Sequence, residues 1–200
     1  VPRLAGLVCL SPIDAAVHDA CAVAAGVSAY QLFGPEFIRD DLARFIGPVG
    51  RGFHADVFLT SDFVPSVPVW HLVGGVDKLR RSEKTAEDPE DGLPVSLDEW
   101  IERDGIFCFK VKLRGNDVEW DVERTARVAE VAAASLNRLG GRRRLCLSVD
   151  SNEMSPSPEA VVEYLRKLRD RSPEAWRALL YVEQPTERDL EANEFDMHPV

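Results

Sequence analysis

The regular alternation of short apolar runs with longer amphipathic segments after residue 66 constrains the fold of this chain more than any other feature. Strands that alternate with helices in this way form parallel sheets joined by crossover helices. The pattern therefore predicts an α/β fold, and either a doubly wound open sheet or a (β/α) barrel satisfies it. The predicted strands are 67–73, 106–113, 145–150 and 179–183, and the predicted helices start near Leu97, Val118 and Ser157.

Residues 1–60 lack this alternation and are predicted to form a separate helical domain, followed by a second domain over 61–200. Ser11 and Pro12 predict a helix start, because serine caps helices well and proline suits the first helical position. The apolar spacing continues until Gly26, which is expected to break the helix.

Composition and apolar run length limit which partners and which cellular location the sequence predicts. The net charge of −10 argues against a nucleic-acid partner, because binding to phosphates depends on lysine and arginine. No apolar run is expected to approach the roughly 20 residues that cross a membrane, and no basic segment precedes an apolar signal. The sequence therefore predicts a cytoplasmic protein without a membrane partner. The four cysteines lack C-x-x-C spacing and are interpreted as reduced core residues.

Ionisable residues occupy three successive predicted strands, where a buried parallel strand should be apolar. Lys110 and Lys112 lie in the second strand, Asp150 ends the third and Glu183 ends the fourth. The carboxyl ends of barrel strands carry functional residues, and charges there are costly unless they pair or bind something. For either carboxylate alone, a helix cap or a surface ion pair is the simpler interpretation, but the joint occurrence favours a site.

The spacing of the two lysines places both on the same face of their strand. Two neighbouring ammonium groups repel, which predicts a lowered pKa for Lys110 or Lys112 and a base that works near neutral pH. Two surface lysines on an edge strand remain the alternative. Asp150 and Glu183 are oxygen ligands of the kind that magnesium prefers, and Asn152 is a candidate contact to substrate.

The ordered series Lys110-Val111-Lys112, Asp150-Ser151-Asn152 and Glu183-Gln184-Pro185 resembles the K-x-K, D-x-N and E-Q-P motifs of the mandelate racemase and muconate-lactonizing branch of the enolase superfamily. Residues 11–34 are similar to the helix pair of that family's α+β capping domain. The resemblance implies the first half of a (β/α) TIM-type barrel preceded by part of the capping domain and truncated before the fifth strand. Longer gaps between the motifs indicate a divergent member.

The resemblance also implies a role for each residue. Lys112 would be the base that removes a proton alpha to a carboxylate, and Lys110 would tune it and face that carboxylate. Asp150 and Glu183 would be two of three Mg²⁺ ligands, with Asn152 beside the substrate. The third ligand and a second catalytic base would lie beyond residue 200.

The implied activity is that of a magnesium-dependent racemase or epimerase, cycloisomerase or dehydratase-type lyase. It would act on a small carboxylate and form a homo-oligomer when full length. The alternatives are a non-catalytic relative that serves as a binding module and an unrelated barrel enzyme with a Schiff-base lysine. His71 is interpreted as a packing residue, and the charged segment 77–92 is either a solvated insertion or a flap over the site.

Overall fold

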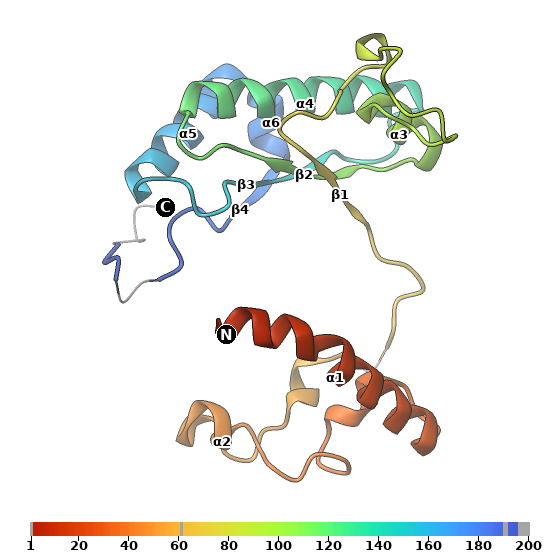
Figure 1. Cartoon of the computed structure of the whole chain (residues 1–200), viewed down its shortest axis with the longest axis vertical. Coiled ribbons are helices and arrows are strands. Elements are labelled where there is room, and N and C mark those ends of the chain that lie inside the picture. The colour runs from red at the N-terminus through yellow and green to blue at the C-terminus, as the bar shows by residue number, and fades with distance from the viewer. Residues whose placement is uncertain (1, 61, 190–191, 196–200) are drawn as a thin grey trace. The chain divides into compact units, whose positions relative to one another are not determined.

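The computed structural model describes residues 2–60, 62–189 and 192–195 and divides the chain into two compact units, Val1–Ser66 and Val67–Val200 (Figure 1). The domain boundary predicted from the sequence lies between residues 60 and 61. Each unit is described separately below.

The first unit is built around one long helix that passes through a proline. Helix α1 spans Arg3–Ala25 and contains Pro12, so the predicted helix start at Ser11 was wrong. The fixed φ of proline is compatible with a helix, and its missing N–H removes one backbone bond without stopping the neighbouring residues from pairing. Gly26 ends the helix as predicted, in a left-handed conformation with φ +69°. The remaining elements are α2 (Ala43–Ile46) and 3₁₀ turns at Ala29–Phe33, Pro48–Gly50 and Ala55–Phe58.

Helix α1 also corrects the expectation that no apolar run is long enough to cross a membrane. By length and composition, Arg3–Ala25 could do so. Core helices of soluble proteins and signal sequences share those properties, so they assign this helix no location. Within the unit, Ala22 and Leu32 are buried, and His18 stacks on Phe33 with ring centroids 4.9 Å apart.

The second unit is a mixed α/β structure with a four-stranded parallel sheet, as predicted. The strands β1 (Trp70–Val73), β2 (Cys108–Lys112), β3 (Cys146–Asp150) and β4 (Leu179–Glu183) are neighbours in chain order. Figure 1 shows the helices over one face of this sheet. They are α3 (Leu97–Asp104), α4 (Val118–Arg138), α5 (Pro158–Arg171) and α6 (Pro173–Ala178), of which α6 was not predicted as a separate helix.

The two faces of the sheet differ in chemistry because side chains alternate along each strand. The face covered by helices carries apolar side chains from every strand, and its most buried members are Val73, Phe109, Val111, Leu147 and Val149. Opposite them, the paired positions Lys112, Asp150 and Glu183 form one row across three strands, next to a row of Leu72, Lys110, Ser148 and Tyr181.

This second face is curled inward. Trp70 on β1 and Tyr181 on β4 meet with ring centroids 5.8 Å apart, although their strands lie at opposite edges of the sheet. Strands are spaced about 4.8 Å apart, so a flat sheet would separate the two backbones by roughly 14 Å. The contact between the rings therefore indicates that the sheet curls toward the face that bears the ionisable residues. We call it the concave face.

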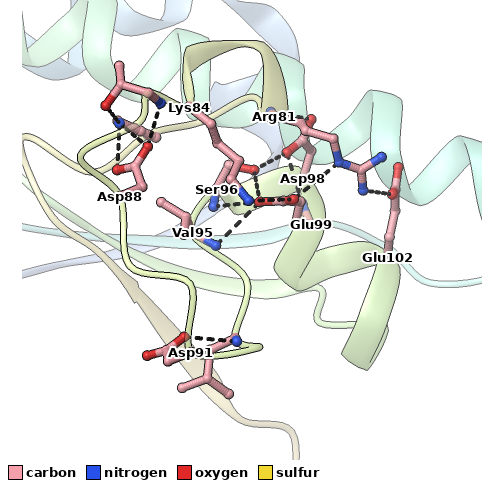
Figure 2. A network of polar contacts seen from close by, with 12 residues as sticks. Arg81, Lys84, Asp88, Asp91, Val95, Ser96, Asp98, Glu99 and Glu102 are labelled. Atoms are coloured by element: carbon pink, nitrogen blue, oxygen red, sulfur yellow. Dashed lines mark hydrogen bonds and ion pairs between the residues drawn. The ribbon is translucent and has the colours of Figure 1, made fainter.

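The segment that follows β1 is tied to the helix layer. Arg80 pairs with Glu130 at 2.8 Å, and Arg81 pairs with Glu99 and Glu102 at 3.2 and 2.9 Å. Figure 2 shows the pairs of Arg81 with Glu99 and Glu102 around the N-terminus of α3, where the predicted capping box of Ser96 and Glu99 is confirmed. Because Arg80 and Arg81 of this segment are bonded to α4 and α3, the structure gives no support to the hypothesis that the segment is a flap over the concave face.

Candidate functional site

The predicted site residues lie together at the carboxyl ends of three strands. The ammonium nitrogen of Lys110 is 2.7 Å from Oε1 of Glu183 and 2.9 Å from Oδ2 of Asp150. Lys112 pairs with the same Oδ2 of Asp150, and its Nζ is 2.7 Å from Oδ1 of Asn152. Residues far apart in the sequence thus form one cluster, because β2, β3 and β4 are adjacent and in register.

The cluster has a buried centre and a more open rim. The side chain of Asp150 is 1% exposed, whereas those of Lys110, Lys112 and Glu183 are 24%, 27% and 33% exposed. The other carboxylate oxygen of Asp150, Oδ1, accepts a hydrogen bond from the backbone N–H of Asn152 at 2.8 Å. Asp150 is therefore the hub that both lysines share.

Pairing, rather than mutual repulsion, sets the ionisation of Lys110. Its hydrogen bond to Glu183 raises the pKa, and the contact with Asp150 adds to this against the opposing effect of burial. The predicted pKa lowering was therefore wrong for Lys110, because two carboxylates outweigh the neighbouring ammonium group. Burial would raise the pKa of Asp150, but hydrogen bonds from Lys112, the Asn152 N–H and Lys110 lower it overall.

The turns that follow β3 and β4 hold each other in place. The hydroxyl of Ser151 donates to the backbone oxygens of Gln184 and Pro185 at 3.2 and 3.0 Å, and the N–H of Glu153 donates to the Gln184 oxygen at 2.8 Å. Asn152, Glu153 and Gln184 adopt φ values of 50°, 67° and 42°, which residues other than glycine rarely take. Strained backbone at strand ends is a recurrent property of functional sites.

Asp121 fixes the turn after β2, a role that sequence reasoning missed. Its buried carboxylate accepts the backbone N–H groups of Arg114 and Gly115 at 2.7 and 2.9 Å. Gly115 has φ +77°, and a Cβ there would lie 2.8 Å from the carbonyl carbon of Met154. The close approach of the turns after β2 and β3 therefore requires glycine. Asp121 lies in the first turn of α4, where acidic residues are common, so the sequence did not indicate these hydrogen bonds.

Ser148 contributes an unusual buried hydroxyl to the concave face. It pairs in register with Lys110 and Tyr181, is fully buried, and its Oγ is one of the few buried polar atoms without a partner in the described part of the chain. A buried hydroxyl without a partner is costly. Sequence reasoning did not single out Ser148, since serine within a strand is common.

The donor chemistry of the cluster suits a hard divalent cation. Oδ2 of Asp150 and Oε1 of Glu183 converge on one positive charge, that of Lys110, and magnesium is often held by one or two carboxylates together with water. Among residues 2–60, 62–189 and 192–195, no three His, Cys, Asp or Glu side chains gather as a metal site. The third ligand was predicted beyond residue 200.

His71 is a packing residue, as predicted. Its ring lies 5.3 Å from that of Trp100 and 6.3 Å from that of Phe109, between centroids, and burial lowers its pKa. It pairs in register with Phe109 on the helix-covered face. His71 is therefore not part of the cluster.

No family model, curated protein or solved structure matches this chain.

Proposed function

We propose that this chain carries part of the active site of a magnesium-dependent enzyme that removes a proton alpha to a carboxylate. The observation that carries the proposal is the convergence of two lysines and two carboxylates at the ends of three consecutive parallel strands. The reaction would be that of a racemase, epimerase, cycloisomerase or dehydratase-type lyase of the enolase superfamily.

The two lysines would have different roles. Lys110 keeps its proton, since its carboxylate partners raise its pKa, and it would present a fixed positive charge to the substrate carboxylate. Lys112, at the end of the strand and partly exposed, would take the proton from the substrate carbon. Asn152, which accepts a hydrogen bond from Lys112, would orient that amine.

Asp150 and Glu183 would hold the magnesium ion, because their oxygens already share one cation. When bound, the ion would supply positive charge that stabilises the electron-rich carboxylate left after proton removal. The hydrogen bond from the Asn152 N–H would fix the orientation of the Asp150 carboxylate, and Ser151 would fix the turn that carries Asn152.

The arrangement of the sheet supports the first half of a (β/α) barrel as the scaffold. A doubly wound sheet changes strand order and has helices on both faces, whereas here the order is sequential with helices over one face (Figure 1). The concave face would form the barrel interior, and the cluster would lie at the end where barrel enzymes carry their active sites.

Deuterium uptake tests the activity directly. The full-length protein, with a complete barrel around this chain, would be incubated with Mg²⁺ in D₂O and a library of alpha-substituted carboxylates, with exchange at the alpha carbon followed by NMR. We expect Lys112→Ala to lose exchange and Lys167→Ala, a surface lysine that pairs with Glu119 and Glu163 on the helix layer, to retain it. Equal exchange in both variants would refute the role of Lys112.

Binding of the ion can be tested without turnover. Mn²⁺ would replace Mg²⁺ as a paramagnetic probe, and its free concentration would be read by electron paramagnetic resonance. Asp150→Asn and Glu183→Gln should each weaken binding at least tenfold, while Asp170→Asn, at an exposed pair with Arg169, should not. Identical affinity in all three variants would exclude this ion site.

One observation favours a second candidate, a relative without catalysis. Lys110, Lys112, Asp150 and Glu183 each have a partner of opposite charge, so the cluster also works as a purely structural ion-pair network. Absence of both deuterium exchange and Mn²⁺ binding would favour this candidate. A Schiff-base mechanism through Lys110 is disfavoured by its raised pKa, because the nucleophile would be the neutral amine.

A further inference from the structure

Two of the cysteines face each other at the end of the sheet opposite the cluster. Cys108 starts β2, Cys146 starts β3, and the two are direct partners in the parallel register. Both lie on the concave face, and Cys108 is two and four positions from Lys110 and Lys112 along β2. Both are free thiols.

The geometry of neighbouring strands allows a covalent bond between them. Paired strands lie about 4.8 Å apart, and Cα atoms joined by a disulfide are usually separated by about 4.4–6.8 Å. The spacing of the two Cα atoms is therefore compatible with a disulfide. A zinc site is not an alternative within the described ranges, because a structural zinc takes four His, Cys or carboxylate ligands and no third such donor joins the pair there.

We propose that Cys108 and Cys146 are an oxidation site, at which thiol–disulfide exchange with a small-molecule disulfide such as oxidised glutathione forms an intrachain disulfide. This inference is independent of the proposed enzymatic function. The bond would link the strand that carries both lysines to the strand that carries Asp150.

Exposure sets the order of the two steps. Cys146 is partly exposed, so its thiolate would attack the glutathione disulfide first, forming a mixed disulfide and releasing one glutathione thiol. Cys108 is 4% exposed, and burial together with Cys146 raises its pKa to about 11, so it would not react first with a molecule from solution. Its sulfur would then attack Cys146, expelling the second glutathione thiol. Two protein thiols and one disulfide thus yield one protein disulfide and two thiols.

Cys9 and Cys21 provide matched controls. Both are exposed on α1, and at about 1.5 Å rise per residue they lie roughly 18 Å apart along the helix. They can accept glutathione but cannot reach each other within one chain. A variant with both replaced by serine would retain only the proposed pair.

The test is mass spectrometry after equilibration of the full chain with mixtures of oxidised and reduced glutathione. In the Cys9→Ser/Cys21→Ser variant we expect loss of the mass of two hydrogens and a peptide that links Cys108 to Cys146. Adding Cys108→Ser should instead trap one glutathionyl group on Cys146. The native chain, mapped by proteolysis, should give the same linked peptide.

Stable adducts on Cys146 in the variant that keeps Cys108 would overturn the proposal. So would two thiols that stay reduced in oxidised glutathione alone, and so would disulfide-linked dimers in place of the intrachain product. The oxidised protein should also unfold at a higher urea concentration than the reduced protein, since the cross-link restricts the unfolded chain.

Discussion

Replacing Asp150 with asparagine would remove the charge that both lysines share. Loss of one partner of a buried ion pair typically costs about 3–5 kcal/mol. The lower end applies here because Lys110 keeps Glu183, Lys112 keeps Asn152, and both lysines are about one quarter exposed. Asparagine keeps the size of the side chain and can still accept the backbone bond within the turn. We therefore expect the free energy of unfolding to fall by about 3 kcal/mol.

Urea unfolding in the presence of a chelator measures this loss. With a slope of about 2 kcal/mol per molar urea, the midpoint should fall by about 1.5 M. Asp170→Asn is the control, because that carboxylate is exposed and pairs with the adjacent Arg169, and it should change stability by less than about 0.5 kcal/mol. A midpoint for Asp150→Asn that coincides with the control would refute the role of Asp150 as hub.

The pH dependence provides an independent check on the same residue. The pKa of Asp150 is lowered in the folded state, so the stabilisation is present above the unfolded pKa of about 3.9 and is lost as the pH falls through the folded value. The stability difference between the native protein and Asp150→Asn should thus be constant near neutral pH and shrink below about pH 4. A difference that widens in acid would contradict this linkage.

Three further substitutions test other features of the sheet and its turns. Gly115→Ala should cost about 2 kcal/mol or more by thermal unfolding, because φ is +77° and the new Cβ would clash with Met154; an unchanged melting temperature would argue against this close approach. Ser148→Ala should stabilise the protein by about 1 kcal/mol in urea, since it removes an unpaired buried hydroxyl, and a clear loss would reveal a partner. Arg81→Met should lower the urea midpoint only slightly, and less still in 1 M salt, since Arg81 is mostly exposed and its ion pairs are screened; a large loss insensitive to salt would contradict this.

Local sequence signals predicted most of the second unit. The strands were visible as apolar runs, and the helix-forming stretch that gives α4 has its apolar side chains on one face. Ser96 and Glu99 marked a helix start because both sides of a capping box lie within four residues. The site residues could be chosen because lysine and aspartate are anomalous inside buried strands, and parallel register then brings their ends together.

The features that escaped prediction depend on contacts between distant segments. The raised pKa of Lys110 arises from Glu183 on another strand, which no neighbour in the sequence indicates. Gln184 has a left-handed backbone conformation, which a glycine in the sequence would usually indicate. Here hydrogen bonds from Ser151 and Glu153 on another turn hold the conformation, so nothing in the sequence indicated it. Helix α1 continues through Pro12, although proline is usually found at the start of a helix; this preference is statistical rather than absolute.

The interlocked turns after β3 and β4 have a consequence for the order of folding. Bonds that join the two turns help to offset the backbone strain at Asn152 and Gln184, and these bonds cannot form until both strands have docked. We therefore expect this corner to consolidate after the folding barrier has been crossed. Kinetically, Ser151→Ala should then accelerate unfolding while leaving the refolding rate nearly unchanged, and a slowed refolding phase would show that the corner is already formed in the transition state.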